Sequence, residues 1–174
     1  MRRRSSCAAA VCLLVAMLST GCRTSPGDAP ALSREEARLQ EIYFVLMTST
    51  QVEKYGTLAT PGERELYLKV IGVWPRYHDL DESRRKAVYI GTLREGMTPD
   101  EATMTLGAPP ARRRVIAADG TPRMLWFHVK GDAKRVYRIL CFEDDRLTRW
   151  RKVAERDYVL LMDKPIEQVM KVFE

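Results

Sequence analysis

Apolar residues recur at helical spacing through residues 33–106 and alternate with polar residues from about residue 111 onward. In the first part, Ser33, Thr60 and Thr98 each stand three residues before a glutamate, and such a pair can cap the start of a helix reciprocally. A fourth helical run opens with acidic residues at Asp81, which suit the positive end of a helix. We therefore expect helices over about 34–48, 60–74, 81–94 and 98–106.

The stretch 96–109 carries both start and stop signals for one short helix. Thr98 is its expected N-cap, and Glu101 completes the capping box. Gly107 can take the left-handed conformation just past the helix, and the prolines that follow prevent its continuation. Pro75 is expected to end the second helix for the same reason.

The alternating part of the chain is divided by turn signals. Asp119-Gly120 is a strong hairpin signal, and Asp144-Asp145 fits a second tight turn better than half of a carboxylate pair. The fold class that we expect is α+β, with N-terminal helices packed on an antiparallel β-meander of three or four strands. The expected strands cover about 112–118, 123–130, 135–142 and 147–153, and a short helix is expected over 165–173.

Residues 1–21 have the features of a targeting segment. Three arginines at 2–4 precede an apolar run over 8–18, and small residues follow it. The apolar run is too short to span a bilayer comfortably. We expect residues 1–21 to be a signal peptide and residues 22–32, which are small, polar and proline-punctuated, to be a flexible tether.

The tetrad Ser19-Thr20-Gly21-Cys22 resembles a bacterial lipobox, in which the cysteine is lipidated and becomes the mature N-terminus. That resemblance implies a lipid on Cys22 that anchors the chain to a membrane without spanning it. Arg23 stands where enteric bacteria place the aspartate that retains lipoproteins in the inner membrane, which implies the outer membrane. The alternatives are an ordinary secretory signal cut near Gly21 and an uncleaved anchor.

Removal of the signal changes the charge and cysteine arguments. The formal net charge of +6 falls to +3, because 29 basic residues become 26 against 23 acidic ones. A nucleic-acid partner is therefore not implied by net charge. Cys7 and Cys12 are removed as well, so a lipidated Cys22 leaves Cys141 without a disulfide partner. We expect Cys141 to be a small buried residue.

The order of elements over about residues 90–152 resembles a known family. The sequence Gly-Met-Thr-Pro-Asp-Glu-Ala-Thr-Met-Thr-Leu-Gly-Ala-Pro over 96–109, a hairpin with Trp126 and Phe127, and the strand 137–142 are similar to the SmpA/OmlA family of small outer-membrane lipoproteins. The resemblance implies a capped helix leading into three antiparallel strands, with helices on one face. The expected division is a helical segment over 33–95 and a family-like part over 96–174.

Catalytic and metal-binding residues cannot be assembled from the sequence. His78 and His128 are the two histidines, and neither has a second His, Cys or acid at ligand spacing. No phosphate loop, nucleophile elbow or nucleophile-base pair is present. We expect a non-enzyme with no metal and no cofactor.

Basic and aromatic residues of the strands are the candidate interaction site. The candidate anionic-surface or partner patch is Arg112, Arg113, Arg114, Arg149 and Arg151, and Lys152 adjoins it. The alternative is a solvated strand face with an edge protected against aggregation. The candidate partner aromatics are Trp126, Phe127 and Trp150, for which the alternative is the core. Alternation sends Trp126 and Phe127 to opposite faces, and the segment 33–95 is a candidate cover for the second face.

These observations favour a membrane-anchored, periplasm-facing lipoprotein that acts as a non-catalytic scaffold or accessory in outer-membrane or envelope assembly. Its expected partners are the membrane, through the lipid on Cys22, and envelope proteins. The alternative is a protein-binding or enzyme-inhibitor module that presents a sheet face.

Overall fold

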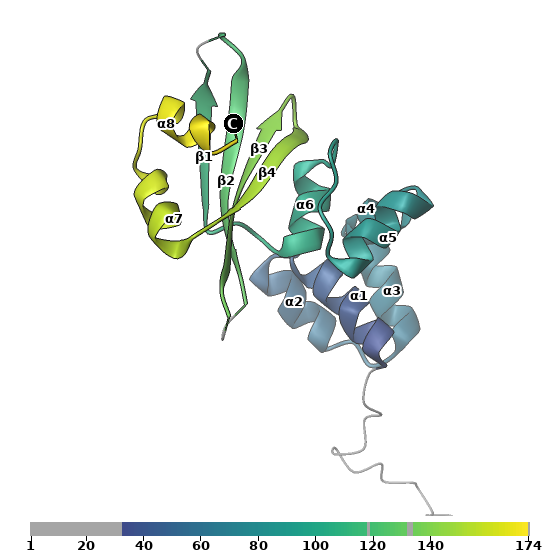
Figure 1. Ribbon diagram of the computed structural model, residues 1–174. Helices are drawn as coiled ribbons and strands as arrows, with labels where there is room; N and C mark the ends of the chain where they lie inside the picture. Colours follow the sequence, from purple (N-terminus) through teal and green to yellow (C-terminus); the bar gives the residue numbers. More distant parts are fainter. Residues whose placement is uncertain (1–32, 118, 132–133, 174) are drawn as a thin grey trace, which may run out of the picture. The chain divides into compact units, whose positions relative to one another are not determined.

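The structure is a computed structural model that describes residues 33–117, 119–131 and 134–173 (Figure 1). The signal peptide expected over 1–21, the tether over 22–32 and the lipidation site Cys22 lie outside these residues. Ser33–Glu174 forms one compact unit by its internal contacts, so the segments 33–95 and 96–174 belong together.

Six helices precede the sheet in the described residues, and four of them start at a capping box. Ser33, Thr60 and Thr98 form their boxes as predicted. The fourth box, Thr48 with Gln51, starts a helix that the sequence analysis did not predict. The helices are α1 (Arg34–Phe44), α2 (Ser49–Gly56), α3 (Pro61–Val70), α4 (Val73–His78), α5 (Glu82–Ile90) and α6 (Pro99–Leu106).

Several predicted details of the helix ends differ from the structure, and the helix expected over 81–94 ends at Ile90. The helix expected over 34–48 ends at Phe44. Pro75 does not end a helix, because it lies in the first turn of α4, where a missing N–H costs nothing. Gly72, with φ 72°, makes the break before it. Gly107 has the expected positive φ, 95°, but its ψ of 174° is extended rather than left-handed, a region essentially restricted to glycine.

The sheet is a four-stranded antiparallel meander in the order β1-β2-β3-β4, so β1 and β4 form its two edges. The expected Asp144-Asp145 turn is present, and both residues have positive φ, 48° and 56°, as a primed hairpin turn requires. The predicted α+β class is thus confirmed. The strands are β1 (Ala111–Ile116), β2 (Pro122–Lys130), β3 (Val136–Glu143) and β4 (Arg146–Val153).

Helices pack on both faces of the sheet. The first face carries Trp126, Leu140 and Phe142, which join a core with Ile42 and Val88 of the N-terminal helices. The second face belongs to a separate core that α7 (Glu155–Met162), α8 (Ile166–Met170) and the 3₁₀ helix η1 (Lys171–Phe173) complete. The segment 33–95 therefore does not cover the second face.

The second core explains the buried cysteine. Cys141 is fully buried there beside Phe127 and Ile139, and Tyr158 and Val169 come from the C-terminal helices. Burial raises the pKa of the Cys141 thiol. Cys141 is thus a core residue with little thiolate character, as predicted.

Candidate protein-interaction surface

The candidate basic residues form two groups on opposite edges of the sheet. Arg112, Arg113 and Arg114 lie on β1, and Arg149 and Arg151 lie on β4, with β2 and β3 between them. All five belong to one sheet, but they do not form one patch. The sequence could not show this, because strand order depends on pairing between distant residues.

Two arginines of β1 have structural contacts. The Arg112 guanidinium lies 4.6 Å from the centre of the Trp126 ring, on the first face. Arg113 lies on the second face, where its Nη1 donates to the carbonyl oxygens of Met162 at 3.0 Å and Lys164 at 2.8 Å. Arg113 thereby caps the C-terminal end of α7, which has no basic residue in its own last turn.

The basic group on β4 is more available. Arg149, Arg151 and Lys152 are exposed, and Trp150 between them keeps 39% of its surface exposed. The strand pairing places Trp150 opposite Leu140 on the first face, and Arg149 opposite Cys141 on the second. An exposed tryptophan within a row of cations is typical of interaction surfaces. We call residues 149–152 the β4 strip.

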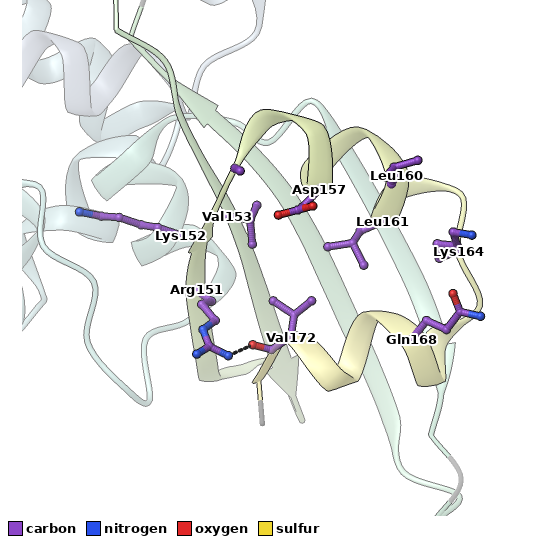
Figure 2. A pocket seen from close by; sticks show the side chains of 10 residues that line it. Arg151, Lys152, Val153, Asp157, Leu160, Leu161, Lys164, Gln168 and Val172 are labelled. Atoms are coloured by element: carbon purple, nitrogen blue, oxygen red, sulfur yellow. Dashed lines mark hydrogen bonds between the residues drawn. The ribbon is translucent and has the colours of Figure 1, made fainter.

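A groove lies beside the β4 strip, between α7 and the pair α8–η1 (Figure 2). Its volume is about 520 Å³. Val153, Leu161 and Val172 converge on it in Figure 2, and Arg151 donates a hydrogen bond to the Val172 carbonyl at its mouth. A second hollow of about 260 Å³ is lined by Arg149, Trp150, Arg151 and Phe173.

The groove was missing from the sequence interpretation because α7 was not predicted. The signal that could have revealed α7 is the apolar spacing of Tyr158, Leu161 and Met162, at i, i+3 and i+4. The groove residues that the sequence analysis did not identify as candidates are Val153, Ala154, Asp157, Leu160, Leu161, Lys164, Gln168 and Val172.

Two of the three candidate aromatics are core residues. Trp126 is buried in the first core, with its ring centre 4.7 Å from that of Phe142. Phe127 is fully buried in the second core, where it meets Tyr158 edge-on at 5.9 Å. Only Trp150 of the three reaches the surface.

Basic side chains on the first face lie near the C-terminal end of α6. Lys130 Nζ approaches the Thr105 carbonyl oxygen at 3.5 Å, and His128 lies near the carbonyl of Leu106. Helix C-termini carry partial negative charge, and α6 has no basic residue in its own last turn. Lys130 therefore supplies that positive complement from the sheet.

His128 is 2% exposed, and burial lowers its pKa from the usual 6.5 to about 4. The neighbouring cations Arg138 and Lys130 act in the same direction, whereas the Leu106 carbonyl opposes them. Its Nδ1 has no hydrogen-bond partner in the structure. His128 is thus a neutral core residue at pH 7.

His78 is held by aromatic residues of the helical part. Its Nε2 lies 2.8 Å from the Tyr43 hydroxyl, and its ring stacks on Trp74 at 3.9 Å. Burial lowers the pKa of His78 and raises that of Tyr43 to about 12. Within the described ranges no three His, Cys, Asp or Glu residues gather as a metal site.

No helix in residues 33–117, 119–131 or 134–173 has the length and apolar character needed to cross a bilayer. The chain matches no protein-family model and no curated protein sequence.

Proposed function

We propose that this protein is a membrane-anchored, periplasm-facing bacterial lipoprotein that serves as a non-catalytic scaffold or accessory in outer-membrane or envelope assembly. The observation that carries the proposal is the β4 strip, where Trp150 is 39% exposed among exposed cations at a sheet edge. A flat, basic and aromatic strip beside a groove suits a protein partner better than a small substrate.

The sequence supports the membrane part of the proposal. The Ser19-Thr20-Gly21-Cys22 tetrad provides the acceptor for a lipid, and the tether over 22–32 gives the folded part freedom to meet partners near the membrane. Helices on both sheet faces favour this proposal over an inhibitor that presents a sheet face, because the central strands offer little bare surface.

Photocrosslinking in intact cells tests the proposal. A photoreactive residue at Trp150 should capture a membrane or envelope protein, whereas the same residue at Ile90, exposed on α5, serves as the matched control. The captured protein should co-purify stoichiometrically from a detergent extract. A soluble secreted partner that binds equally well without the lipid would instead support the inhibitor alternative.

Cys22→Ala tests the anchor. The substitution should abolish labelling by a fatty-acid analogue and release the chain from the membrane fraction. Persistence of the unlabelled variant in membranes would contradict the lipid anchor.

A further inference from the structure

The outer edge of β4 is paired at one end only. The Leu147 N–H donates to the Met97 carbonyl at 2.7 Å, and the Gly96 N–H donates to the Leu147 carbonyl at 2.8 Å. Beyond this contact, no backbone–backbone hydrogen bond among the described residues involves the outer side of residues 149–153, although η1 lies against β4 through the hydrogen bond from Arg151 to the Val172 carbonyl. The edge therefore already accepts backbone from a turn of its own chain, and the backbone groups along its remaining length are not paired with another strand.

Both hollows described above adjoin this open length. The 520 Å³ groove and the 260 Å³ hollow share Arg151 as a lining residue, and residues of η1 line both. An added strand would direct alternate side chains to the second face, about 7 Å apart. Two side chains of such a strand at positions i and i+2, both directed to the second face, would therefore face the two hollows.

The charge around the open edge is strongly one-sided. The two hollows beside this edge are lined by four basic residues and one acidic residue, Asp157. The basic residues are Arg149, Arg151, Lys152 and Lys164. The hollow near β1 is balanced, with Arg114 and Arg123 against Asp144 and Asp145. Charge complementarity therefore favours an acidic occupant and places it at β4.

We propose that residues 149–153 dock an extended, acidic segment of a partner protein, which pairs with β4 as a fifth strand and places apolar side chains in the two hollows. This inference rests on the proposed function and specifies its partner chemistry and binding mode. Main-chain hydrogen bonds would hold the segment, and the cations and hollows would select it. The open length accommodates about five residues, or about 16 Å of extended chain.

Peptide binding to the purified, detergent-solubilised full chain tests the proposal. The probe is a fluorescent, end-blocked Glu-Val-Glu-Val-Glu-Val-Glu peptide, measured by anisotropy. It should bind about tenfold or more tightly than its Lys-Val counterpart, since the charges then repel. A version with N-methyl groups along one edge should also bind at least about tenfold more weakly, because it cannot complete the strand pairing.

Variants locate the site. Arg149→Glu with Lys152→Glu should weaken binding of the glutamate peptide by about tenfold or more. The matched control, Arg114→Glu with Lys86→Glu, also reverses one exposed arginine and one exposed lysine, and it should change affinity less than about twofold. If circular dichroism shows that the first variant is misfolded, Arg149→Gln with Lys152→Gln replaces it.

Several results would overturn the inference: no binding at about 1 mM peptide, which is the weak limit for specific recognition; equal binding of the N-methylated peptide; or equal weakening by both double variants. None of these touches the proposed function, which the crosslinking experiment tests. A crosslink from Trp150 to an envelope protein, together with failure of the peptide, would keep the function and remove the strand-pairing mode of binding.

Discussion

Burial of His128 predicts that the fold loses stability on mild acidification. The folded-state pKa of about 4 lies below the unfolded value near 6.5, so only the unfolded chain gains this proton as the pH falls between these values. The contribution is fully present above pH 6.5 and is lost progressively toward pH 4. Between about pH 7.5 and about pH 5, the free energy of unfolding should fall by about 2 kcal/mol from this group alone.

The assay is urea denaturation followed by tryptophan fluorescence at several pH values. His128→Leu places an apolar side chain of similar bulk at the buried position and removes the titrating group. The variant should lose about 2 kcal/mol of the pH dependence over this range, whatever its stability at neutral pH. His78→Gln is the control for the other histidine, whose lowered pKa acts in the same direction.

The comparison is made above pH 5 because carboxyl groups with lowered pKa, such as that of Asp119, affect stability at lower pH. If His128→Leu and the parent lose the same free energy between pH 7.5 and pH 5, His128 is not the buried neutral group described here.

Three further substitutions test the fold. Gly107→Val should destabilise the folded state by about 1 kcal/mol or more in thermal melting, because a residue with a side chain is strained at the φ and ψ of Gly107. The control in the same assay is Gly62→Val, since Gly62 has open space around it and no positive φ. Glu101→Ala should cost about 2 kcal/mol in urea unfolding, since Glu101 accepts from the Thr98 N–H at 2.7 Å and from Arg84 at 2.9 Å; a cost near zero would contradict a structural role for the capping box. Phe127→Ala should cost about 3–5 kcal/mol by calorimetry, and a loss below about 1 kcal/mol would show that the second core is not packed as described.

Local chemistry made much of the fold predictable from sequence. The boxes at Ser33, Thr60 and Thr98 depend on residues three apart, and the Asp144-Asp145 turn depends on two adjacent residues, so short-range rules sufficed. The helix over Ser49–Gly56 was missed because Val52 and Tyr55 are its only large apolar residues, too few to show a helical period.

The candidate site was less predictable because it depends on distant parts of the chain. The sequence identified Arg149, Arg151 and Trp150, but not the groove beside them. The groove exists because α7 and η1 return to the sheet, and Arg113 of β1 holds α7 through carbonyls 49 and 51 residues away. No local pattern contains that information.

The two hydrogen bonds between Leu147 and residues 96–97 also constrain how the molecule folds. They join the last strand to the start of α6 across about fifty residues, so the helical part and the sheet stabilise each other through backbone hydrogen bonds. That contact forms only after the roughly fifty intervening residues have closed into a loop. The early helices can therefore form quickly, whereas the complete fold forms only once the meander has formed. We expect a single cooperative unfolding transition for residues 33–173, in which loss of β4 also releases the start of α6.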